Sequence, residues 1–235
     1  MKTGEPMTLK LNFKIIATFF FALFFTFIPV IVSGDYQWVE GWTLAILSIF
    51  FSILARVLAA HKNPDIIQER ASFTDAEGIK PWDKKVVLLI SFTIPFLIYV
   101  FFGLDRRFGW SMPVPTLIRV LGLLVFLSGF VLSTWAMVEN RFFSSVVRIQ
   151  TERGHTVCDS GPYRWVRHPG YLGGLIGWVG IPLFLGSLWG YIPVLIEMTL
   201  YVIRTRLEDQ TLQAELPGYK EYAQRTRFRL LPGIW

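Results

Sequence analysis

The sequence is poor in cysteine, histidine and charge. Its 235 residues include a single cysteine, Cys158, and three histidines. One cysteine excludes an intramolecular disulfide framework. The histidines, His61, His155 and His168, have no H-x-x-x-H spacing, and Cys158 belongs to no C-x-x-C pair. We therefore predict that the protein binds no metal.

Charged residues make up only 17% of the chain, whereas 53% of it is hydrophobic and the mean hydropathy is +0.46. A soluble domain normally has about a quarter charged residues, so this composition excludes an ordinary soluble protein and favours a membrane one. The sequence also lacks strand patterns and the glycine-rich fingerprints of nucleotide-binding folds. We predict an all-α integral membrane protein.

Four apolar runs have the length that a helix needs to cross a bilayer, which is roughly 20 residues. They cover residues 15–32, 42–60, 86–104 and 117–138. The basic residues before the first run leave a cleaved signal peptide as an alternative, but the run is long and no small-residue cleavage site follows it, which favours a retained span. Pro29 and Pro95 are expected to kink their helices without ending them.

A fifth apolar region, residues 171–203, is too long for one span and too short for two. Its centre is the turn-forming stretch Gly186–Gly190 (GSLWG), which predicts a helical hairpin with arms Tyr171–Leu185 and Tyr191–Ile203. Such a hairpin enters the membrane and returns to the same side. The expected organisation is therefore four transmembrane helices in residues 1–138, followed in residues 139–235 by a cofactor segment, this hairpin and a cytoplasmic tail.

The net charge of +6 reflects topology in this interpretation and not nucleic-acid binding, because the basic residues lie between the apolar runs. Most of them occur before the first run and in segments 61–85, 139–170 and 204–235. The opposite connections carry few basic residues. The positive-inside rule then predicts that the N-terminus, segment 139–170 and the C-terminal tail are cytoplasmic, with segment 61–85 as a cytoplasmic connector.

Three stretches on that side contain most of the polar residues that could form a site: residues 140–157, 160–171 (SGPYRWVRHPGY) and 204–235. Because the hairpin returns the chain, the second and third stretches should meet at its open end. Arginines beside membrane spans are usually topological anchors, which would account for most of Arg141, Arg148, Arg164 and Arg167 taken one at a time.

Taken together, these stretches predict a functional site. His168 and Pro169 begin a hairpin helix, whose first free amides favour anions. Arg204 and Glu208, four residues apart, share a helix face where the chain leaves the membrane. A pocket with both signs of charge at this depth would bring a soluble charged molecule to a lipid-borne one.

The stretches GHTVCDSGPYRWVRHPGYLGG and RLEDQTLQAELPGYKEYAQRTRFRLLPGIW carry a family resemblance. The first contains G-x-Y-x-x-x-R-H-P-x-Y, and the second contains an acidic pair, GYKEY and a basic segment that ends in L-P. Residues 140–235 resemble the isoprenylcysteine carboxyl methyltransferase family, which is related to the membrane phospholipid N-methyltransferases. The first four predicted spans resemble the family only in being apolar and long enough to cross a membrane.

The resemblance implies an integral membrane enzyme that uses S-adenosylmethionine. The positions that it assigns to the cofactor are Gln150, His155, Thr156, Val157, Cys158, Tyr163, His168, Pro169, Gly170, Tyr171, Glu208 and Asp209. Gln150 is displaced by a couple of residues from the family's glutamine, and Asp209 stands where the family usually has a second glutamate. Arg204 matches the arginine that acts on the methyl acceptor, so Arg204 and Glu208 are the expected catalytic pair.

The acceptor implied by the resemblance is the carboxylate of an isoprenylcysteine-like, lipid-borne molecule. The alternative is an amine on a phospholipid or another lipophilic molecule, for which Glu208, Asp209 or His168 would take up the proton. A third hypothesis, a non-catalytic membrane scaffold, is disfavoured by the intact motif set. A Ser–His nucleophile is also open, although the sequence places no serine beside His168.

Overall fold

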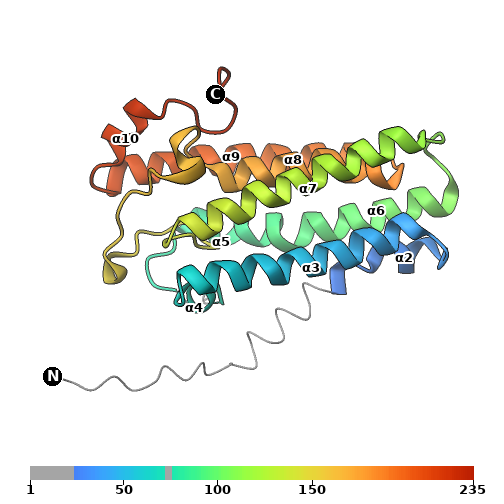
Figure 1. Ribbon diagram of the computed structural model, residues 1–235, viewed down its shortest axis with the longest axis horizontal. Helices are drawn as coiled ribbons and strands as arrows, with labels where there is room; N and C mark the ends of the chain where they lie inside the picture. Colours follow the sequence, from blue (N-terminus) through green and yellow to red (C-terminus); the bar gives the residue numbers. More distant parts are fainter. Residues whose placement is uncertain (1–23, 72–75) are drawn as a thin grey trace.

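The computed structural model describes residues 24–71 and 76–235, and this part of the chain is helical and contains no strand (Figure 1). The helices are α2 (Ile28–Ser33), α3 (Val39–Lys62), α4 (Ile66–Ala71), α5 (Pro81–Leu88), α6 (Ile94–Phe108), α7 (Thr116–Glu139), α8 (Pro169–Leu185), α9 (Tyr191–Glu215) and α10 (Tyr219–Arg225). Single helical turns of other types occur at Leu89–Thr93 (π) and at Thr151–Arg153 and Gly161–Arg164 (3₁₀).

Three helical segments of the described chain are long and apolar enough to cross a membrane: Val39–Lys62, Pro81–Phe108 and Thr116–Glu139. They contain the second, third and fourth predicted runs. Residues 15–23 of the first predicted run lie outside the described residues, and the rest of that run includes the short helix α2. The three segments indicate an integral membrane protein.

The third span continues through Pro95, as predicted. The π turn Leu89–Thr93 directly precedes α6, which has Pro95 in its first turn. Proline has no N–H and its ring collides with the carbonyl one turn earlier, so a wider turn at this place accommodates it.

Helices α8 and α9 form the predicted hairpin, and Gly186 ends α8 with a positive φ of 72°. The second arm is predicted as Tyr191–Ile203; α9 begins at Tyr191 and continues without a break to Glu215, so Arg204 and Glu208 lie on one helix as expected. Residues 204–215 contain neither glycine nor proline, and the first helix breakers are Pro217 and Gly218. The polar residues after Ile203 therefore lie on the same continuous helix as the apolar residues before it.

Helices α7 and α8 pack backbone against backbone along a row of glycines. A Cβ atom placed on Gly129 of α7 would lie 2.4 Å from the carbonyl oxygen of Gly173 on α8, and one placed on Gly180 would lie 2.5 Å from that of Gly122. Small residues of this kind let membrane helices approach closely. The contact sets the position of α8, whose first turn carries the R-H-P-x-Y motif.

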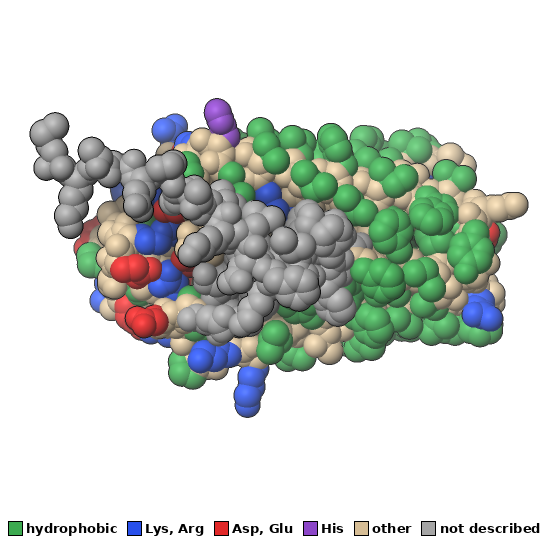
Figure 2. All heavy atoms as spheres, turned by 90° about the horizontal axis from the view of Figure 1, so that it is seen from below, with side chains coloured by type: hydrophobic (Ala, Val, Ile, Leu, Met, Phe, Trp, Pro, Cys, Tyr) green, Lys and Arg blue, Asp and Glu red, His purple; other side chains and the backbone are tan. Residues whose placement is uncertain are grey.

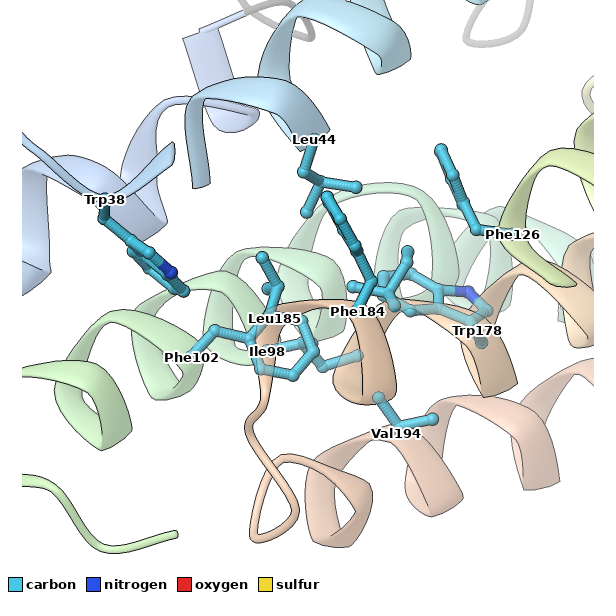
Figure 3. Close-up of a cluster of buried hydrophobic side chains, with 10 residues drawn as sticks. Trp38, Leu44, Ile98, Phe102, Phe126, Trp178, Phe184, Leu185 and Val194 are labelled. Carbon is cyan, nitrogen blue, oxygen red and sulfur yellow. The ribbon is translucent and has the colours of Figure 1, made fainter. Parts of the chain in front are cut away.

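The hydrophobic core lies between these helices (Figure 3). It contains large side chains from α3, α6, α7, α8 and α9, together with Trp38 just before α3: Leu44, Ile98, Phe102, Phe126, Trp178, Phe184, Leu185 and Val194. Charged side chains gather mainly at one end of the molecule, where α4 and α10 lie in Figure 1, while apolar side chains cover much of its length (Figure 2). The molecule is thus an apolar bundle with a polar end.

Candidate functional site

A cavity of about 400 Å³ opens into the bundle at this polar end. Its walls come from α3, α4, α7, α8, α9 and α10, from the π turn before α6 and from the segment between α7 and α8. The structure brings most of the sequence-predicted site residues to these walls: Gln150, His155, Thr156, Val157, Cys158, Tyr163, His168, Gly170, Tyr171, Arg204 and Glu208. Pro169 and Asp209 are buried beside the cavity without lining it.

The two polar stretches on either side of the hairpin meet, as predicted. The backbone N–H of Arg167 donates to the carbonyl of Phe228 at 2.9 Å, and that of His168 donates to Arg229 at 3.0 Å. The hydroxyl of Tyr171 donates to Glu208 Oε2 at 2.5 Å. The start of α8 is therefore tied both to α9 and to the C-terminal tail.

Asp209 lies at the centre of the contact between α8, α9 and the C-terminal tail and is completely buried. Its carboxylate is surrounded by donors: Arg167 Nε at 2.7 Å and Nη2 at 3.0 Å, Gln213 Nε2 at 2.7 Å, Arg229 Nε at 2.8 Å, Tyr219 Oη at 3.1 Å and His168 Nε2 at 3.3 Å. Burial alone would raise the pKa of Asp209, but the bonds from His168 and Arg167 lower it below its usual range. With so many protein donors, Asp209 has little capacity left for a ligand.

Glu208 differs from its neighbour Asp209 in facing the cavity and being only half-buried. Its Oε2 accepts the Tyr171 hydroxyl, and its Oε1 lies 4.0 Å from His168 Nδ1. No other partner of Glu208 is found in the described chain, so Oε1 is available to a ligand with hydroxyl or amino donors.

The segment after α7 contributes Gln150 and His155. The Gln150 side chain is 1% exposed, donates to the carbonyl of Phe142 at 2.8 Å and accepts from Arg153. The Gln150 backbone N–H donates to His155 Nδ1 at 3.2 Å, so Nδ1 bears no proton and the neutral ring carries its proton on Nε2. Burial, with Arg148 and Arg153 nearby, lowers the pKa of His155 to about 4. His155 is therefore a neutral donor at physiological pH.

Segment 61–85 holds this part of the site in place, which goes beyond the predicted role of a connector. Arg148 makes a two-bond ion pair with Glu69, at 2.7 and 3.1 Å, and both side chains are buried. Arg153 pairs with Asp65 at 2.6 Å. Arg148 and Arg167 are more than topological anchors, because each is paired with a carboxylate inside the protein.

The wall on the α10 side is aromatic and apolar. Tyr163, Tyr219 and Tyr222 lie there with Val157, Leu212 and Leu216. Burial raises the pKa of Tyr163 well above its usual value, so its phenol stays neutral. The cavity thus combines a face suited to a flat ring with a charged face around Glu208 and Arg204.

Arg204 lies on the opposite wall and is 6% exposed. Its guanidinium pairs with Asp83 of α5 through two hydrogen bonds, of 2.8 and 3.0 Å. Sequence reasoning missed Asp83; the available signal was a lone carboxylate beside Lys84 at the start of an apolar run, a pattern that usually marks a solvated charge. Two further arginines, Arg56 and Arg70, also line this side of the cavity.

Residues 117–216 match the model of the phospholipid methyltransferase family. No curated protein shows a significant match to the chain. The family match spans α7, α8 and α9 with the segment between α7 and α8, and so includes the predicted site residues from Gln150 to Asp209. It implies a methyltransferase that works in the membrane on lipids.

The matched range does not contain the whole cavity. Arg56, Arg70 and Asp83 lie before residue 117, yet they line the cavity or hold Arg204. The preceding helices α3 and α4 therefore supply part of the cavity wall, and α5 supplies the carboxylate that pairs with Arg204.

Proposed function

We propose that the protein is an integral membrane methyltransferase that uses S-adenosylmethionine and acts on a lipid-borne acceptor from the cytoplasmic side. The observation that carries the proposal is the gathering of residues 150–171 and 204–208 around one cavity at the polar end of an apolar bundle. The family match over residues 117–216 supports the same reaction class.

The residues around the cavity fit the chemistry of this cofactor. A volume of about 400 Å³ is within the usual range for small-molecule sites, roughly 300–1,000 Å³. Tyr163 and Val157 offer a flat apolar wall to an adenine ring, and Glu208 offers a carboxylate to hydroxyl or ammonium donors. At the start of α8, the N–H groups of Gly170 and Tyr171 have no partner in the described chain and suit a carboxylate.

The cofactor would supply an electrophilic methyl group on a sulfonium sulfur. A carboxylate acceptor attacks with its own lone pair, and the electron pair of the broken carbon–sulfur bond returns to sulfur, so the reaction needs no base. The task of the protein is to align the two molecules and exclude water, which can lower the barrier by roughly 7–11 kcal/mol. We assign the orientation of the acceptor to Arg204, through charge-assisted hydrogen bonds.

The arginines of the cavity are compatible with a carboxylate acceptor, as in an isoprenylcysteine. Arg56, Arg70 and Arg204 line its inner side, and Arg70 keeps its charge although burial, with Arg56 and Arg204 nearby, lowers its pKa to about 10. An anionic group would be attracted to this wall.

A phospholipid amine is the second candidate, and the family match supports it equally well. An ammonium group must lose a proton before it can accept a methyl group, and the half-buried Glu208 is the carboxylate in reach of the cavity.

Cofactor binding tests the reaction class. Calorimetry on the purified protein in lipid should detect binding of S-adenosylmethionine, and Glu208→Gln should weaken it by at least tenfold because the variant loses a charged acceptor. Glu221→Gln, on the exposed face of α10, is the matched control and should bind like wild type. Absence of binding by the wild-type protein would refute the proposal.

The labelled product then distinguishes the acceptors. Membranes incubated with methyl-labelled cofactor should yield a label that base releases if an ester forms, and a base-stable label if an amine is methylated. A base-stable product would assign the phospholipid amine and reject the carboxylate.

A further inference from the structure

Asp83 is a buried carboxylate that precedes the region matched by the family model, residues 117–216. It lies in the first turn of α5, two residues after Pro81, and its exposure is 0%. Its Oδ1 accepts from Arg204 Nε at 2.8 Å and its Oδ2 from Arg204 Nη2 at 3.0 Å. The backbone N–H of Val147 also donates to Oδ2, at 2.7 Å. One side chain thus connects α5, α9 and the segment that carries Gln150 and His155.

These bonds determine which edge of Arg204 is available. Arg204 Nη2 donates a second hydrogen bond, to the carbonyl of Ser145 at 2.7 Å, and the Tyr171 ring lies 5.6 Å from the guanidinium carbon. The Nε and Nη2 hydrogens are therefore committed within the protein, while Nη1 has no hydrogen-bond partner in the described chain. Because Arg204 lines the cavity, its Nη1 group is the donor that can reach a ligand.

The charge of Asp83 matters as much as its geometry. Asp83 does not line the cavity, so a ligand meets Arg204 and not the carboxylate behind it. Arg70 and Arg56 stand on the same side of the cavity, and without Asp83 the charge on Arg204 would be opposed only by more distant groups such as Glu208. Like charges in one apolar site repel, so an uncompensated guanidinium would turn toward solvent or toward Glu208.

We propose that Asp83 is a positioning residue for methyl transfer: it fixes the guanidinium of Arg204 so that Nη1 alone orients the acceptor. The inference rests on the proposed function and adds a residue outside the matched region to the machinery. A positioning role predicts a loss in turnover with cofactor binding intact, because a displacement of about 1 Å in a reacting pose can cost a factor of about 100.

The test compares wild type, Asp83→Asn and Asp83→Glu in lipid, with labelled S-adenosylmethionine and two acceptor probes, N-acetyl-S-farnesylcysteine and phosphatidylethanolamine vesicles. We expect Asp83→Asn to lower kcat by about 10- to 100-fold, and to leave both the KM of the accepted probe and the calorimetric cofactor affinity within about twofold of wild type. Asp83→Glu keeps the charge on a longer side chain and should recover part of kcat.

A double variant separates positioning from a general structural role. In an Arg204→Ala background, Asp83→Asn should change the residual kcat by less than about twofold, because the group that it positions is gone. Wild-type kcat in Asp83→Asn, an unchanged penalty in the Arg204→Ala background, or loss of cofactor binding in Asp83→Asn would each overturn the proposal. A wild-type protein that binds no cofactor and methylates neither probe would instead overturn the proposed function.

Discussion

At the scale of single residues, the two neighbouring acids of α9 have divided roles. Glu208 faces the cavity, whereas Asp209 is enclosed by donors from α8, α9, α10 and the tail. Because the pKa of Asp209 is lower in the folded protein than in the unfolded chain, its ionisation stabilises the fold above about pH 4, and this contribution is lost progressively as the pH falls below that value. Asp209 thus stabilises the fold by holding α8, α10 and the tail against α9.

The variant Asp209→Asn tests the stabilising role of this carboxylate. The change leaves the buried guanidinium of Arg167 without its anionic partner and should lower the free energy of unfolding by about 3–5 kcal/mol. Asp159→Asn is the control, because Asp159 pairs with Arg225 at the exposed surface and should cost less than about 1 kcal/mol. Thermal unfolding in detergent measures both. Equal stability of the two variants would contradict the claim that the buried carboxylate of Asp209 stabilises the fold.

At the scale of elements, the position of the site depends on the contact between α7 and α8. The first turn of α8 presents His168, Gly170 and Tyr171 to the cavity, and α7 fixes that turn both through the glycine row and through the Ser133 hydroxyl, which donates to the carbonyl of Gly170 at 3.0 Å. The backbones approach too closely for a methyl group at several positions, but not at all of them.

This difference gives a matched pair of variants. Gly129→Ala places a Cβ 2.4 Å from the carbonyl oxygen of Gly173, a backbone atom that cannot move without shifting α8. It should cost about 1–3 kcal/mol and weaken cofactor binding. Gly177→Ala has its nearest neighbour at 3.9 Å and should be neutral or stabilising by roughly 0.5–1 kcal/mol, since alanine favours the helix. Melting temperatures that fall equally in both variants would contradict the packing argument.

At the scale of the whole molecule, hydropathy predicted the helical class and three apolar runs, each of which lies within one of the three long apolar helices. Motif spacing predicted that the stretches around Tyr171 and Glu208 meet. The ion pairs with segment 61–85 were not predictable. Asp83 pairs with a residue 121 positions away, and Glu69 with one 79 positions away. Such pairs depend on how whole helices pack, and no local pattern distinguishes a carboxylate buried against an arginine from a solvated one. The exact end of α9 at Glu215 was not predicted, because hydropathy reports where the apolar surface ends and not where the helix ends.

The number of lysine and arginine residues at each end of the bundle predicts its orientation in the membrane. The end with α4, α10 and the tail is rich in lysine and arginine, while at the other end Arg106 pairs with Asp35 at 2.7 Å and Arg119 with Glu40 at 2.5 Å. Lysine and arginine residues close to membrane spans are retained on the cytoplasmic side, whether or not carboxylates lie nearby. The site, at the basic end, should therefore face the cytosol.

Single cysteines in a Cys158→Ser background test this orientation. Met112→Cys lies in the connection between α6 and α7, where Met112 is 77% exposed, and Gln224→Cys lies on the exposed side of α10 at the opposite end of the bundle (Figure 1). A membrane-impermeant maleimide should label Met112→Cys in intact cells, and should label Gln224→Cys only after the membrane is permeabilised. The reverse pattern would place the cavity outside the cell. It would also contradict the proposed function, in which a water-soluble methyl donor would reach the cavity from the cytosol.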